Sequence, residues 1–143
     1  MIPNYRMMIG LFYEYNNKYF GGILPDPTLK IRHSYRILGY FSCDVNYDGT
    51  IFNECIELSD NYDYTERQIR DILVHEMIHY YLAYFGIDIK CKHGYEFMKK
   101  ASEMNSKYGM NITPTIDLTG YNIKKGKSKL IFTLSTLFWY LYV

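Results

Sequence analysis

The sequence predicts a single-domain α+β protein, because helical and strand-like patterns occupy separate stretches of the chain. One helical pattern lies near the N-terminus, short strand-like segments follow between residues 28 and 59, and two further helical patterns lie between residues 65 and 108. A chain of 143 residues is long enough for one hydrophobic core and short for two. We therefore expect one domain over residues 1–143, with a core at about 4–109 and a C-terminal extension at about 110–143.

Apolar residues recur at helical spacing from Met7 to Phe20, which predicts an N-terminal helix that closes on Gly21 and Gly22. The segments that follow have strand character, and the Asp48-Gly49 pair is a turn signal between two of them. They predict a small antiparallel or mixed sheet of three to four strands, at residues 28–33, 39–42, 50–53 and 56–59.

A capping box, Thr65-x-x-Gln68, marks the start of a second helix that runs to about residue 85, where Gly86 can end it. The interior of this helix has no glycine or proline and a broad apolar face, so we expect it to be the most buried helix. A third helix is predicted from about residue 93 to residue 108, with Gly109 as its stop.

The last fourteen residues, 130–143, are almost entirely apolar and carry no charge. A membrane-spanning helix needs about 20 such residues, so we expect one or two strands that pack back on the domain. Two alternatives stay open. The segment can dip into a membrane with a neighbouring lysine cluster facing lipid phosphates, or the chain can be truncated before a further module. The cluster consists of Lys124, Lys125, Lys127 and Lys129, and it otherwise fits a solvated hairpin or linker.

The charge balance excludes a global attraction to nucleic acid, because 16 Lys and Arg residues against 15 Asp and Glu residues give a net charge of +1. Any nucleic-acid binding must therefore be local to the lysine cluster. Cys43, Cys55 and Cys91 form no Cys-x-x-Cys pair, so neither a disulfide framework nor a zinc ribbon is predicted. The N-terminal segment lacks the pattern of a signal peptide, and we expect reduced thiols and a cytoplasmic location.

The motif His75-Glu76-Met77-Ile78-His79 lies inside the predicted second helix, and its spacing is typical of a zinc site. Residues four apart stand on the same helix face, so the imidazoles of His75 and His79 can bind one ion. Glu76 lies where its carboxylate can reach a metal-bound water without binding the metal, which makes it the candidate general base. The simpler alternative is that both histidines lie on a helix face and make ordinary hydrogen bonds.

His93 is the leading candidate for the third ligand that a catalytic zinc site usually has. It follows a glycine-containing loop that can double back, and the positive end of the third helix disfavours the charged imidazolium. A rival motif would need glycine at position 82 and histidine at position 85, where the chain has Leu82 and Phe85. Fallback ligands are Glu96, Glu103 and, more weakly, Cys91, whereas His33 fits an ordinary strand-end histidine.

Three stretches of the chain resemble the SprT-like metalloprotease family, which includes the Spartan proteases that degrade proteins crosslinked to DNA. They are YNNKYFGGILPDPTLKI, DILVHEMIHYYLAYFG and HGYEF, and together they cover roughly residues 12–105. The resemblance implies a compact zincin-like domain with one catalytic zinc ion, held by His75, His79 and His93, and Glu76 as the catalytic residue. It also implies that the strand at residues 56–59 receives an extended substrate by backbone pairing.

We therefore expect a zinc-dependent metalloendopeptidase that acts on protein substrates, with DNA-associated proteins and DNA–protein crosslink repair as the setting that the resemblance suggests. Many SprT-like proteins carry a cysteine-based zinc ribbon after the protease core, but no cysteine follows Cys91 here. Two other functions stay open: a zinc-containing scaffold domain without activity, for which Glu76 would not be needed, and a metal-dependent hydrolase of non-peptide amides. An open groove beside an edge strand would favour the protease, and a deep closed pocket the amide hydrolase.

Overall fold

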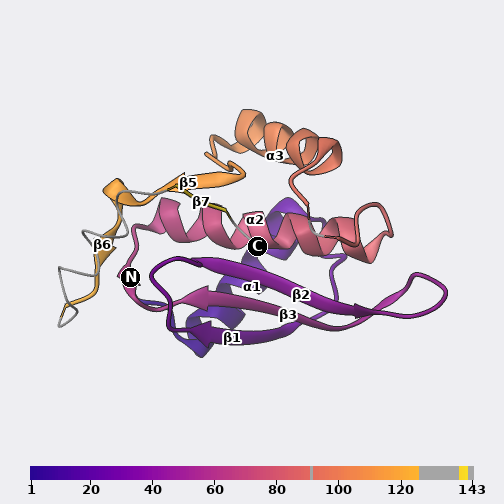
Figure 1. Ribbon diagram of the computed structural model, residues 1–143, viewed down its shortest axis with the longest axis horizontal. Coiled ribbons are helices and arrows are strands. Elements are labelled where there is room, and N and C mark those ends of the chain that lie inside the picture. The colour runs from indigo at the N-terminus through magenta and orange to yellow at the C-terminus, as the bar shows by residue number, and fades with distance from the viewer. Residues whose placement is uncertain (91, 126–138, 142–143) are drawn as a thin grey trace.

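The computed structural model describes residues 1–90, 92–125 and 139–141, and this part of the chain has the predicted α+β organisation (Figure 1). Within these ranges, three α-helices accompany a three-stranded mixed sheet, two short two-stranded pairings and one 3-10 turn. The elements are α1 (Tyr5–Tyr19), β1 (Thr28–Arg32), β2 (Gly39–Val45), β3 (Ile51–Ser59), β4 (Tyr62–Asp63), α2 (Glu66–Tyr84), α3 (Tyr95–Tyr108), β5 (Thr115–Asp117), the turn Leu118–Gly120, β6 (Asn122–Ile123) and β7 (Trp139–Leu141).

The main sheet has the order β1-β3-β2, with β1 parallel and β2 antiparallel to the central strand β3. The predicted turn is confirmed, because Gly49 has a φ of 86° in the hairpin between β2 and β3. The prediction of separate strands at 50–53 and 56–59 is wrong, since β3 is continuous. The register shifts between Ser42 and Asp44, where β3 has one residue more than β2. Asn53 lies in this bulge of β3 and has a φ of 54°, so the residue pattern breaks while the pairing continues.

One face of the sheet is buried, and the helices cover it. Ile56 and Leu58 of β3 and Phe41 of β2 are at most 2% exposed, whereas Lys30 of β1 lies on the solvent side. Helix α2 lies between the sheet and α3 (Figure 1). This middle position explains why α2 is buried on nearly all sides, as its apolar interior predicted.

The predicted helix ends are confirmed by side-chain and glycine caps. Thr65 and Gln68 form both hydrogen bonds of the capping box at the start of α2. Gly86, after α2, has a φ of 69°, and Gly109, after α3, has a φ of 65°; both are left-handed conformations that favour glycine. Helix α3 begins at Tyr95, slightly later than predicted.

Two asparagine side chains fasten the loops that follow α1 and α3. The Asn16 amide donates to the Leu24 carbonyl (2.9 Å) and accepts from the Leu24 N–H (3.2 Å). The Asn105 amide makes the same pair of bonds with Ile112, at 3.0 and 2.8 Å. Each loop is therefore held in place by a side chain of the preceding helix. The amide both donates to and accepts from the backbone of one loop residue, as paired residues of two β-strands do.

The buried core continues past residue 109, because Ile112 is 3% and Leu118 0% exposed. Strand β7 pairs antiparallel with β5, which agrees with the predicted strand character of the C-terminal segment for Trp139–Leu141. Residues 126–138 and 142–143 lie outside the described part, and with them most of that prediction. Among the described residues no helix is both long and apolar enough to cross a membrane.

Replacing Thr65 with alanine removes the N-terminal cap of the most buried helix, so we expect the free energy of unfolding to fall by about 1 kcal/mol. Urea denaturation followed by circular dichroism measures the change. Ser102→Ala, an exposed change within α3, is the matched control and should leave the stability nearly unaltered. Equal stability of Thr65→Ala and the parent protein would contradict a working capping box.

Candidate metal centre

Two elements bring the three predicted histidines together. His75 and His79 stand one turn apart on α2, and His93 lies directly before Gly94, the N-terminal cap residue of α3. The loop between the helices doubles back as predicted, because the N–H groups of Ile87 and Asp88 both donate to the Leu82 carbonyl. His75 and His79 are at most 1% exposed and His93 is half-buried.

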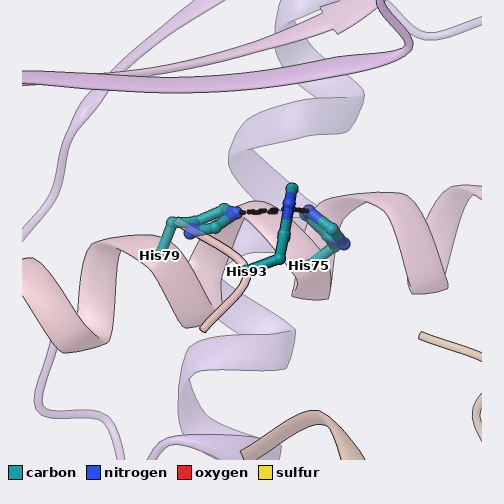
Figure 2. A group of neighbouring side chains, drawn as sticks. All are labelled: His75, His79 and His93. Carbon is teal, nitrogen blue, oxygen red and sulfur yellow. Dashed lines mark hydrogen bonds between the residues drawn. The ribbon is translucent and has the colours of Figure 1, made fainter. Parts of the chain in front are cut away.

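The three imidazoles converge through their Nε2 atoms (Figure 2). The Nε2 atom of His75 is 3.0 Å from that of His93, and the Nε2 atom of His79 is 3.2 Å from each of the other two. Nitrogen ligands that share a zinc ion at about 2.0–2.1 Å in a tetrahedral arrangement are about 3.3 Å apart. The group therefore has the size and the donor atoms to hold a single metal ion.

The protonation state of the rings also suits ligation. Burial lowers the pKa of His75 well below its usual value, and the nearby rings of His79 and His93 lower it further. Burial and His93 together lower the pKa of His79 to about 3, and burial lowers the pKa of His93. All three rings are therefore neutral near pH 7, which is the form that binds metal ions.

The ring of Phe97 contacts all three imidazoles, a role that was not predicted from the sequence. Its ring centroid lies 4.7, 4.6 and 4.8 Å from those of His75, His79 and His93, and its side chain is 0% exposed. The sequence marked Phe97 only as part of the apolar face of the third helix. Its position four residues after His93, one helical turn on, was the available signal.

Glu76 lies between α2 and strand β2. It is 0% exposed, and within the described residues neither carboxylate oxygen has a partner at hydrogen-bonding geometry. Burial raises the pKa of the Glu76 carboxyl well above its ordinary value, and the backbone of Phe41 opposes this shift only in part. Burying a carboxyl with so little hydrogen bonding destabilises a fold, so packing alone does not explain Glu76 at this position.

Gly39 makes room for this carboxyl. A Cβ atom at Gly39 would lie 2.8 Å from Oε1 and 2.9 Å from Cγ of Glu76, closer than real Cβ atoms approach other atoms. The missing side chain lets the backbone of β2 lie directly against Glu76. This contact could not be predicted from the sequence, because it depends on how β2 packs on α2.

A sequence model of the SprT-like family matches residues 9–117, about three quarters of the chain. The chain belongs to the SprT-like family. The matched range includes the three histidines, Glu76 and Gly39. A search of curated proteins finds no match.

The remaining ligand candidates of this SprT-like domain lie apart from the group. Glu96 and Glu103 are exposed on α3, where both line a separate surface pocket. His33 is exposed, and its Nδ1 atom lies 2.6 Å from Oδ1 of Asp60 at the end of the sheet, so it is a strand-end histidine as expected. Cys91 lies outside the described residues.

The expectation that residues 56–59 receive the substrate is wrong. This part of β3 pairs with β1 on one side and with β2 on the other, so its backbone has no free edge. The strand of the main sheet that packs against Glu76 is β2, and among the described residues it is an edge strand. The backbone edge beside the site therefore belongs to Gly39–Val45.

The contact between Gly39 and Glu76 can be tested by stability alone. We expect Gly39→Ala to lower the free energy of unfolding by about 1–3 kcal/mol through overpacking. Part of this cost should vanish in a Glu76→Ala background, because the shortened side chain leaves space for the new methyl group. Chemical denaturation of the two single variants and the double variant measures the coupling.

The matched control for this cycle is Gly120→Ala, since a Cβ atom at Gly120 would meet no atom within 4 Å. An equal cost of Gly39→Ala in both backgrounds would show that Glu76 does not occupy the space beside Gly39.

Proposed function

We propose that this protein is a zinc-dependent metalloendopeptidase in which His75, His79 and His93 bind the ion and Glu76 is the general base. One observation carries the proposal. Three neutral imidazoles converge on one point, and the buried carboxyl of Glu76 follows His75 directly on α2. Membership of the SprT-like family is compatible with this activity.

The donor set favours zinc among the common metal ions. Imidazole nitrogen suits zinc and other late transition metals, whereas magnesium and calcium prefer oxygen ligands. Three protein ligands are the usual number for a catalytic zinc site and leave a further coordination position open. When bound in such a site, zinc supplies a water of lowered pKa and polarises a carbonyl group.

Glu76 moves the proton in this proposal. Its carboxylate accepts a proton from the attacking water and then passes it to the nitrogen of the leaving amine. The backbone of Glu76 is part of α2, and its side chain packs against Gly39 of β2. These two contacts hold the carboxyl in position. The low-polarity surroundings strengthen the carboxylate as a base, because burial favours its protonated form.

The edge of β2, which pairs with no further strand in the described part of the chain, supports a peptide as the substrate. An extended peptide can pair with the backbone of Gly39–Val45 and so place a peptide bond beside Glu76. Backbone pairing recognises little sequence, and low specificity for the cleaved residues would follow. This edge also favours a protease over a hydrolase of small amides, which need no such strand.

A silent zinc-binding scaffold is the less favoured function. A structural zinc site gains nothing from a carboxyl that is 0% exposed and poorly hydrogen-bonded in the described structure, and such a group costs stability. The retention of Glu76 beside three histidines is better explained by catalysis.

Replacing Glu76 with glutamine should abolish proteolysis and preserve zinc, because the amide cannot accept the proton and the three imidazoles stay in place. We expect at least a hundredfold fall in the rate of cleavage of unfolded casein. Zinc content, measured by elemental analysis, should stay at one ion per chain. His79→Ala should lose the ion, and His33→Ala, a histidine outside the site, should lose neither zinc nor activity.

A Glu76→Gln variant that cleaves casein as fast as the parent protein would remove Glu76 from the mechanism. A parent protein that binds zinc but cleaves neither casein nor short peptides would instead favour the scaffold.

A nucleic-acid partner remains a proposal that rests on the lysine cluster. Lys124 pairs with Asp60 at 3.4 Å, Lys125 is exposed, and Lys127 and Lys129 lie outside the described residues. If all four lysines contact phosphates, affinity for a DNA duplex should fall by roughly a hundredfold between 50 and 200 mM salt. Fluorescence anisotropy measures this dependence, and no binding at low salt would contradict the proposal.

A further inference from the structure

A groove of about 430 Å³ lies between α1 and the segment that enters β1, and it contains none of the residues of the candidate metal centre. Helix α1 forms one wall, and the residues from Asp26 to Leu29 form the other. The residues that carry the argument are Tyr5, Ile9, Gly10, Tyr13, Asp26 and Pro27.

The helix wall presents apolar side chains to solvent. Tyr5, Ile9 and Tyr13 are 60%, 46% and 70% exposed and follow one another at intervals of four residues, so they form a stripe along one side of α1. The nine residues from Tyr5 to Tyr13 are separated by eight steps of helical rise, so the stripe spans about 12 Å. Exposed tyrosines at such spacing are characteristic of binding surfaces, because they offer a large contact area at little cost in conformational entropy.

Gly10 opens the groove in the middle of this stripe. Glycine is among the least favourable residues in a helix interior, and here no described neighbour requires it, since a Cβ atom at Gly10 would meet nothing within 4 Å. Gly39 shows the contrast, because Glu76 occupies the space beside it. The space over Gly10 is therefore open, and a side chain of a bound partner can approach the helix backbone there.

Asp26 gives the opposite wall a negative charge. Its carboxylate is exposed and has no ion pair or hydrogen bond within the described residues. The segment that carries it is held in place, because the Tyr80 hydroxyl donates to the Pro25 carbonyl at 2.8 Å and Pro27 restricts the following backbone. A fixed, unpaired carboxylate beside exposed tyrosines fits a cationic side chain, above all arginine, which can both stack on a ring and pair with a carboxylate.

We propose that this groove binds a proline-rich peptide segment with one arginine, in the extended polyproline II conformation. Aromatic-lined grooves are the usual receptors for this conformation, which is already ordered before it binds. Four residues of such a helix span about 12 Å, the length of the tyrosine stripe. The arginine pairs with Asp26, and a proline ring fills the space over Gly10.

The groove then recruits a protein at a place separate from the candidate metal centre. Binding here does not depend on catalysis, so a failure of this proposal leaves the proposed protease intact, and the reverse also holds. A recruiting site would add selectivity that backbone pairing along β2 cannot supply.

A fluorescent nine-residue peptide of prolines with one central arginine tests the proposal by anisotropy with the whole chain. We expect saturable binding to the parent protein and at least tenfold weaker binding of a matched peptide with glutamate in place of arginine. Gly10→Leu, which fills the groove, and Asp26→Lys, which reverses its charge, should each weaken binding of the arginine peptide at least tenfold. Glu103→Lys, the same charge reversal on α3, should leave the affinity unchanged.

Folding is controlled by Gly10→Ala, which should raise the melting temperature because alanine is the better helix former. Absence of saturable binding up to millimolar peptide would overturn the proposal, as would equal affinity for both peptides or undiminished binding to Gly10→Leu. Two further results would assign the groove to other occupants and also overturn it: a dimer of the parent protein in sedimentation that Gly10→Leu dissociates, or binding to phosphatidylcholine vesicles that Gly10→Leu abolishes.

Discussion

The structure is organised around the cost of burying polar groups on helix α2. His75, Glu76 and His79 are at most 1% exposed, in a helix that lies between the sheet and α3. A buried imidazole or carboxyl destabilises the fold unless it stays neutral and finds compatible neighbours. The described neighbours of α2 meet this constraint with apolar surface and a further imidazole, and the backbones of Phe41 and Thr113 contact Glu76 and His75.

Each neighbour of α2 contributes in a different way. Strand β2 supplies a glycine, so that its backbone approaches Glu76 without a side chain between them. Helix α3 supplies Phe97, whose ring lies against all three imidazoles, and the residue before its cap supplies His93. The geometry of the site is therefore a property of three elements together, and α2 alone carries only part of it.

Much of this could be predicted from the sequence, because local rules govern it. The capping box, the glycines after α2 and α3, the Asp48-Gly49 turn and the spacing of His75 and His79 are all short-range features. The continuity of β3 could not be predicted, since a bulge within β3 breaks its residue pattern, nor could the edge strand, which depends on sheet order. Gly39 and Phe97 were missed for the same reason, because their roles exist only where separate segments meet.

The two asparagine clamps make the position of each loop depend on a single amide group. Asn16 and Asn105 each use both the donor and the acceptor of the amide to hold a loop. Asparagine is thermolabile, and deamidation replaces the NH2 donor with a carboxylate oxygen. That oxygen would face the carbonyl of Leu24 or Ile112, so attraction would turn into repulsion. Deamidation of Asn16 would loosen the loop that leads into β1. Deamidation of Asn105 would loosen the segment that brings the backbone of Thr113 next to His75.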